Sequence, residues 1–168
     1  VDQLGLSGAV RVLDAACGPG ADLLTLAETL PEAQITGMEQ VPHFVAAANA
    51  CVAAHAPRVT AREADMSRLD STYDLIWCAG ALYFLGVTQG LQGWRNALTS
   101  DGAVAFSEPV LLQTPPSAAV SAFWEEYPQI TDLDGIVARV NAADYDVRAH
   151  RMIVGAPWQA YYSPMQRR

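Results

Sequence analysis

Apolar residues gather in short runs that alternate with longer stretches of helical character. The first run, AVRVLDA at 9–15, predicts a buried strand because it is short, apolar and followed by glycines. Similar runs predict strands at 33–39, 58–64, 73–79 and 103–109. The intervening stretches predict helices at 21–30, 42–56 and 90–102. Strands that alternate with helices in this way are typical of a parallel sheet covered by helices on both faces.

After Pro109 the alternation becomes less regular. Residues 114–127 and 132–143 have a helical pattern, 146–154 predicts a sixth strand, and 156–168 opens like a further helix. No repeat, low-complexity stretch or linker divides the chain, so we expect one domain over residues 1–168.

Composition narrows the classes of function. The chain is 51% hydrophobic and 17% charged, which allows a proper core, and its net charge is -8 with no lysine. That charge opposes phosphate binding, so we expect no nucleic-acid partner. No apolar run reaches the roughly 18 residues of a membrane span, so we expect no membrane partner either. The oligomeric state stays open, with a dimer as one alternative.

The three cysteines are scattered along the chain. No two of them have the spacing of zinc ligands or of a disulfide framework, so we expect no metal site. Reduced thiols are typical of a cytoplasmic protein, which is the location that we expect.

Two glycines follow the first run in VRVLDAACGPGADLL and predict a turn where the backbone approaches a ligand closely. The helix expected from Ala21 presents free N–H groups there, which suit a carboxylate or a phosphate. A dinucleotide-binding turn would have a third glycine where Leu23 stands. Asp14 would repel a pyrophosphate but attract an ammonium group. The turn therefore favours a ligand with an amino-acid end and argues against a nicotinamide-dependent oxidoreductase.

Further acidic residues follow the next two predicted strands. Glu39 lies about twenty residues after the glycines, where an acidic side chain binds ribose hydroxyls; the alternative is a solvated carboxylate. Asp65 could accept the exocyclic amine of an adenine while Met66 covers the ring; the alternative is an aspartate in a turn or helix cap. Together with Asp14, these positions describe an adenosine that carries an amino acid.

These segments resemble the class I S-adenosylmethionine-dependent methyltransferases, in particular those acting on small molecules. VLDAACGPG is similar to their first motif, GMEQVP to their ribose-binding segment, EADM to their adenine segment, and YDLIWCAGALYFL to their fourth strand and its loop. The resemblance implies S-adenosyl-L-methionine as cofactor. The residues implied to contact it are Asp14, Ala16, Cys17, Gly18, Gly20, Glu39, Gln40, Asp65, Met66, Cys78, Ala79 and Gly80.

The resemblance implies a Rossmann-like three-layer α/β/α sandwich with a mostly parallel central sheet. Members of the family usually have helices before the first strand that close over the cofactor, and they usually finish the sheet with an antiparallel strand. Only about ten residues precede the first strand here, and the chain ends in a helix-like segment. We therefore expect a fold that is truncated or reduced at the N-terminal lid and at the last strand.

The expected reaction is transfer of a methyl group to a small-molecule acceptor by in-line displacement. The sequence lacks the Pro-Pro motif of base-amine methylation, the Pro-Cys nucleophile of cytosine methylation and the carboxylate cluster of metal-assisted methylation. Candidate catalytic residues are Glu108 as a base, Tyr83 as a wall of the acceptor pocket, and His150. The alternative function is a non-catalytic module of this fold that binds the cofactor or a protein partner.

Overall fold

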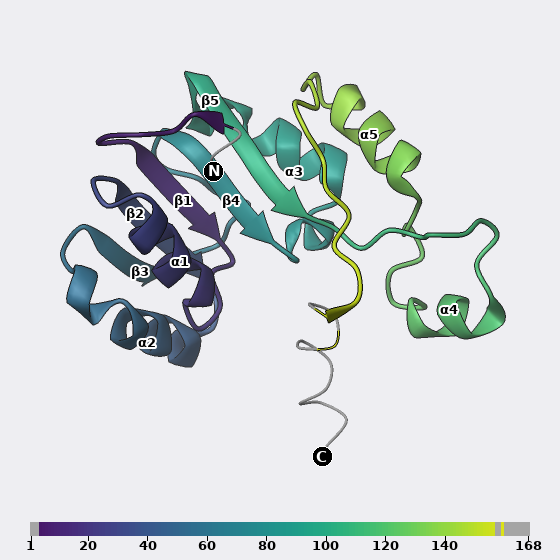
Figure 1. Cartoon of the computed structure of the whole chain (residues 1–168), viewed down its shortest axis with the longest axis horizontal. Helices are drawn as coiled ribbons and strands as arrows, with labels where there is room; N and C mark the ends of the chain where they lie inside the picture. Colours follow the sequence, from purple (N-terminus) through teal and green to yellow (C-terminus); the bar gives the residue numbers. More distant parts are fainter. Residues whose placement is uncertain (1–3, 157–158, 160–168) are drawn as a thin grey trace.

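The computed structural model describes residues 4–156 and 159, and its centre is a parallel five-stranded sheet (Figure 1). The strand order is β3-β2-β1-β4-β5, and every neighbouring pair is parallel. The strands are β1 (Arg11–Ala15), β2 (Gln34–Glu39), β3 (Val59–Glu63), β4 (Tyr73–Ala79) and β5 (Leu98–Ser107). The predicted fold class, a helix-covered Rossmann-like sheet, is confirmed.

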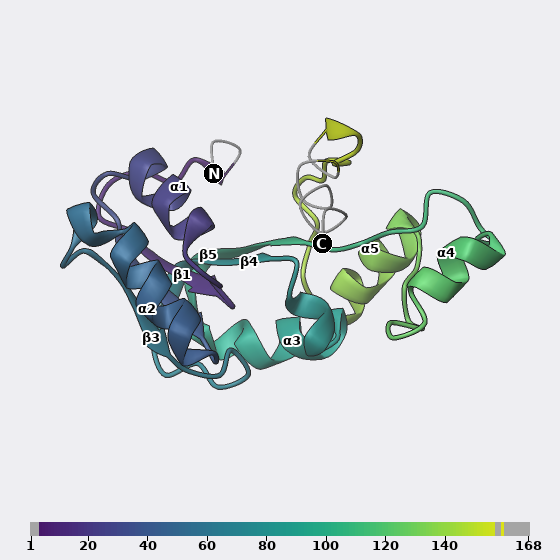
Figure 2. The ribbon, with the colours of Figure 1, turned by 90° about the horizontal axis from the view of Figure 1, so that it is seen from below.

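Helices cover both faces of this sheet. The helices α1 (Ala21–Thr29) and α2 (Pro42–Cys51) lie on one face, and α3 (Val87–Trp94) and α5 (Leu133–Ala142) belong to the other. Figure 2 shows α1 and α3 on opposite sides of β4 and β5. The short helix α4 (Ala118–Phe123) projects away from the sheet (Figure 1). Short 3-10 turns lie between the described helices and strands: η2 (Ala53–His55), η3 (Leu82–Phe84) and η4 (Arg95–Ala97).

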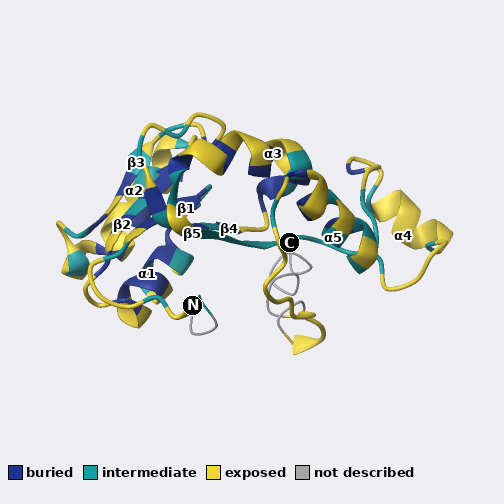
Figure 3. Ribbon diagram, turned by 90° about the horizontal axis from the view of Figure 1, so that it is seen from above, coloured by how far each residue is buried: buried dark blue, intermediate teal, exposed yellow. Residues whose placement is uncertain are grey.

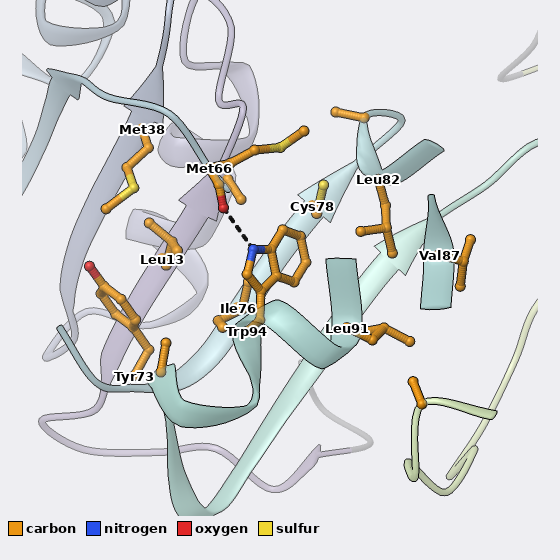
Figure 4. Packing of buried hydrophobic residues seen from close by; sticks show 14 of the residues in the cluster. Leu13, Met38, Met66, Tyr73, Ile76, Cys78, Leu82, Val87, Leu91 and Trp94 are labelled. Atoms are coloured by element: carbon orange, nitrogen blue, oxygen red, sulfur yellow. Dashed lines mark hydrogen bonds between the residues drawn. The ribbon is translucent and has the colours of Figure 1, made fainter. Parts of the chain in front are cut away.

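The alternation of side chains along each strand creates two cores. Val12 and Leu75 pack with α1 and α2, whereas the next residues, Leu13 and Ile76, pack with α3 and α5. At the centre of the second core, Trp94 is 1% exposed, and its indole Nε1 donates to the Met66 carbonyl at 2.7 Å (Figure 4). This bond satisfies the only polar atom of a large buried side chain. Buried residues follow the sheet, while α4 is largely exposed (Figure 3).

Three sequence predictions differ from the structure. The helix expected over 90–102 begins earlier, at Val87, and α3 and η4 end by Ala97, so that 98–102 belong to β5. Leu98 pairs with Tyr73 and Ala103 with Leu75, which leaves an irregular step between the two pairs. Gly102 permits this step, because a Cβ there would lie 3.0 Å from the carbonyl oxygens of Thr99 and Tyr73.

The sixth strand predicted at 146–154 is wrong. These residues are exposed and form no ladder with another described strand, although several of them are apolar. Apolar content alone cannot make a strand, because the backbone also needs a neighbouring strand to bond. The helix predicted over 114–127 is reduced to α4, and the one over 132–143 is confirmed as α5. The helix predicted over 156–168 falls largely outside the described residues.

The order of the strands decides where a ligand binds. From β1 the chain moves outward through β2 to β3, then crosses back to β4 and β5 on the other side. The order therefore reverses between β1 and β4, and ligands of open parallel sheets bind beyond the carboxyl ends of the strands at such a point.

Candidate functional site

The turn after β1 has a backbone that few residue types adopt. Ala16, Gly18 and Gly20 all have positive φ angles, of 60°, 52° and 94°. A Cβ at Gly18 would contact nothing within 4 Å, so this glycine serves the left-handed conformation and leaves open space beside it. A Cβ at Gly20 would lie 2.8 Å from the Ala48 Cα, so this glycine also lets α1 start against α2. The result is a tight turn with bare backbone at the carboxyl end of β1.

Glu39, at the end of β2, is bonded to this turn. Its Oε2 accepts from the Gly18 backbone N–H at 3.1 Å, and its Oε1 accepts from the Val41 N–H at 2.9 Å. The carboxylate therefore joins the glycine turn to the start of α2 and keeps acceptor capacity on each oxygen. Gln40, beside it, is exposed. The glycine turn and the acidic end of the second predicted strand, both singled out from the sequence, are thus brought together.

Asp65 lies in a turn beyond β3 and is exposed. Its Oδ1 accepts from the Ser67 backbone N–H at 2.8 Å, and that bond is the main reason why the pKa of Asp65 lies below its ordinary value. Asp65 therefore has the role in a turn that was the alternative to adenine binding. Its second carboxylate oxygen can still accept a hydrogen bond. Met66 is only 8% exposed and packs in the α3 core (Figure 4).

Among the residues that the structure describes, Asp14 is the one charged side chain that is buried, with 1% of it exposed. It lies in register with Gly37 on β2 and Trp77 on β4. Its Oδ2 has no hydrogen-bond partner. Burial, and secondarily the charge of Asp22, raises the pKa of Asp14 to about 8. A carboxyl group with an unpaired oxygen is costly to bury, which marks Asp14 as a candidate ligand-binding group.

Asp22 and Trp77 are members of this site that the sequence did not reveal. Asp22 lies in the first turn of α1, and its Oδ2 accepts from the Trp77 indole Nε1 at 2.9 Å. The two residues are 55 positions apart in the chain. An acidic residue in the first helical turn has an ordinary explanation in the helix dipole, so the sequence carried no signal of the contact.

Two buried thiols and a glycine border the same region. Burial raises the pKa of Cys17 and of Cys78 to about 12, so both thiols are neutral. Ala79 and Gly80, at the end of β4, are exposed, and the Gly80 N–H donates to the Ser107 carbonyl at 3.3 Å. The carboxyl ends of β4 and β5 are thereby held together next to the turn.

Beyond β5 the structure assembles a second polar group around Glu108. The Tyr127 hydroxyl donates to Glu108 Oε1 at 2.8 Å, and Arg139 on α5 donates to the Tyr127 hydroxyl oxygen at 3.3 Å. The ring of Tyr83 lies 5.3 Å from that of Tyr127. Burial raises the pKa of Glu108, although the bond from Tyr127 opposes this shift.

Two of the three predicted catalytic residues, Glu108 and Tyr83, thus both contact Tyr127. The third, His150, is exposed in the irregular segment 146–154. The sequence did not reveal Tyr127 and Arg139 as site residues. Both lie after Pro109, where the pattern of apolar residues does not show how the chain packs against the sheet.

Within the described residues, no group of three or more His, Cys, Asp or Glu side chains has the arrangement of a metal site. In the same part of the chain, no helix is both long and apolar enough to cross a membrane.

Comparisons with known proteins agree with the fold. A family model described as "Methyltransferase domain" matches residues 12–102. The chain is 34% identical over 113 residues to demethylmenaquinone methyltransferase of Deinococcus radiodurans, covering 65% of this chain and 45% of that protein. It is 31% identical over 129 residues to trans-aconitate 2-methyltransferase of Streptomyces avermitilis, covering 69% and 47%. The matches therefore span about half the length of these curated relatives.

A solved structure with the same fold extends the comparison. A SAM-dependent methyltransferase from Geobacter sulfurreducens, in complex with S-adenosyl-L-homocysteine, superposes with a TM-score of 0.82 at 26% identity. The superposition covers 99% of this chain and 71% of that one.

Proposed function

Because this chain belongs to the class I S-adenosylmethionine-dependent methyltransferases, we propose that it transfers a methyl group from S-adenosyl-L-methionine to a small-molecule acceptor. The observation that carries the proposal is the bond between the Gly18 N–H and Glu39, which unites the glycine turn and the acidic end of β2. The names of the two curated relatives, which act on demethylmenaquinone and trans-aconitate, favour a small-molecule acceptor.

The residues at the carboxyl ends of β1 to β4 fit the three parts of such a donor. Asp14 and the turn that contains Ala16, Cys17, Gly18 and Gly20 would hold the methionine end, since a buried carboxylate suits an ammonium group. Glu39 and Gln40 would hold the ribose, for which carboxylate and amide oxygens are suitable partners.

The adenine and the sulfonium would lie further along the same edge. Asp65 retains an acceptor oxygen for an exocyclic amine, with Met66 directly following it. Cys78 and Ala79 end β4 next to the turn and Gly80 follows them, and the neutral Cys78 thiol places no charge there. This assignment uses every cofactor-contacting position that the resemblance implies.

When bound, S-adenosylmethionine supplies an activated methyl group, so the protein has mainly to align the acceptor and exclude water. Glu108 is our candidate for taking a proton from the acceptor, because its Oε2 is buried without a partner. Tyr83 would form the neighbouring wall. His150 is left out of this assignment because it is exposed and lies outside the cluster.

Isothermal titration with S-adenosylhomocysteine tests the proposal. We expect saturable binding by the wild-type chain, and a loss of about tenfold or more in Glu39→Ala, since a charged hydrogen bond is worth about 1.5–3 kcal/mol. Glu63→Ala is the matched control, because Glu63 ends the adjacent strand and is exposed. Absence of binding by the wild-type chain would refute the proposal. Tight binding without turnover of any acceptor in a panel of phenols, carboxylic acids and amines would instead favour the non-catalytic module.

A further inference from the structure

Two carboxylates from different elements lie near each other at the start of α1. Asp14 comes from β1 and Asp22 from the first turn of α1, and they are close enough for Asp22 to raise the pKa of Asp14. Asp22 is held in place by the Trp77 indole, which comes from the neighbouring strand β4 at the register position opposite Asp14. The pair is therefore a fixed feature of the fold.

The pair lacks a positive partner in the described part of the chain. The ion pair found there joins Arg62 to Asp70, and neither Asp14 nor Asp22 takes part in one. Only 1% of Asp14 is exposed, and no group donates a hydrogen bond to its Oδ2. Two neighbouring carboxyl groups can both ionise favourably only when a cation lies beside them, so the arrangement is suited to a cationic ligand.

The remaining groups that face Asp14 do not supply the missing charge. Cys17, in the turn, is a thiol that stays neutral, as does Cys78, whose side chain packs on the other face of β4. On β2 the residue in register is Gly37, which has no side chain. On β4 the Trp77 N–H is used by Asp22. Asp22 is thus the charged group that faces Asp14 among the described residues.

We propose that Asp22, positioned by Trp77, joins Asp14 in a two-carboxylate subsite for the α-ammonium group of the methyl donor. This inference rests on the function proposed above and names a residue that the family resemblance does not include. Because Asp14 is buried without a donor at Oδ2, donor binding should release its proton to the solvent, and the ammonium then balances the charge of the carboxylate.

The subsite makes two demands on ligand chemistry. It favours S-adenosylhomocysteine, which carries the ammonium group, over 5′-methylthioadenosine, which has the same adenosine but no amino-acid end. It also couples affinity to pH, because Asp14 holds a proton in the free protein below about pH 8 and must lose it to pair with a cation. Affinity for the amino-acid-bearing ligand should therefore increase by up to about tenfold per pH unit in this range.

Isothermal titration of the whole chain with both ligands tests the inference. At about pH 6 and about pH 7 the ligand ammonium stays largely protonated, and two buffers of different ionisation enthalpy count the protons released. We expect the wild-type chain to release close to one proton per S-adenosylhomocysteine and none per 5′-methylthioadenosine. Asp14→Asn should abolish the release. Asp22→Asn should weaken S-adenosylhomocysteine by about tenfold, the worth of one charged hydrogen bond, and leave 5′-methylthioadenosine unchanged.

Two further variants test whether the position of Asp22 matters, or only the negative charge of α1. Glu28→Gln removes one exposed charge from the same helix and should leave both affinities unchanged. Trp77→Phe frees Asp22 and should weaken only S-adenosylhomocysteine. Wild-type affinity in Asp22→Asn, or an equal loss for both ligands, would overturn the inference while the proposed function stands. Failure of the wild-type chain to bind either ligand would overturn both.

Discussion

At the end of β5, the two oxygens of Glu108 have different surroundings. Oε1 accepts from the Tyr127 hydroxyl, while Oε2 is buried without a partner. Burial raises the pKa of this carboxyl, whereas the bond from Tyr127, the charge of Arg139 and the backbone of Tyr83 oppose that shift. Both oxygens of Glu39 accept from backbone N–H groups, so this residue stabilises the local fold in addition to any contact with a ligand. Surroundings therefore assign these two glutamates different roles.

Tyr127→Phe tests this balance at Glu108. The substitution removes a hydrogen bond that favours the ionised carboxylate, so the pKa of Glu108 should increase further and the acid form should persist to higher pH. Carbon-13 NMR of a chain labelled at glutamate carboxyls, with Glu108→Gln to assign the signal, measures the shift.

Tyr145→Phe is the control for this experiment. Its hydroxyl donates to the Leu91 carbonyl, so the substitution deletes the same phenolic hydroxyl at another place in the fold. A Glu108 pKa that is unchanged or lower in Tyr127→Phe would contradict the explanation.

At the scale of elements, glycines decide how closely α1 approaches α2. Gly20 is the N-cap of α1 and has a φ of 94°, and the position that a Cβ would occupy lies 2.8 Å from the Cα of Ala48 on α2. Backbone atoms cannot give way as a flexible side chain can. Gly93, inside α3, is the opposite case, because a Cβ there would meet no atom within 4 Å and the residue is exposed.

We expect Gly20→Ala to lower the free energy of unfolding by about 2–4 kcal/mol, from left-handed strain and overpacking together. Gly93→Ala should raise it by about 0.5–1 kcal/mol, because alanine restricts the unfolded chain and favours a helix. Urea denaturation of the two variants beside the wild-type chain measures both changes. Equal effects of the two substitutions on the free energy of unfolding would show that the contact with Ala48 does not limit how closely α1 packs against α2.

Periodicity predicted most elements of this fold, and the misses have a common cause. The five apolar runs became the five strands, because a buried parallel strand is apolar on both faces. The segment 146–154 is as apolar in places but has no neighbouring strand, and the chain alone does not show whether one is available. The glycine turn and Glu39 were predictable because each directly follows a strand. Asp22, Tyr127 and Arg139 were not, because only tertiary contacts give them partners.

For the molecule as a whole, Asp14 links the site to the stability of the fold. A carboxyl whose pKa is about 8 when folded, against an ordinary value of 3.8, binds its proton more tightly in the folded state. Its contribution to stability is complete below about pH 3.8 and is lost as the pH rises through about 8. The free protein should therefore carry a destabilising charge at alkaline pH, which is the cost of keeping an unpaired carboxylate ready for a cation.

Asp14→Asn should remove this dependence, since the amide has no charge to desolvate. We expect the variant to match the wild-type chain within about 1 kcal/mol at acidic pH, where both side chains are neutral, and to exceed it by a few kcal/mol above about pH 8. Urea denaturation across this pH range measures the difference. Asp70→Asn is the control, because Asp70 belongs to an exposed ion pair with Arg62, and such pairs contribute little to stability. A constant difference between Asp14→Asn and the wild-type chain at all pH values would mean that Asp14 is ionised throughout, and the buried carboxyl would then need a partner that neutralises it.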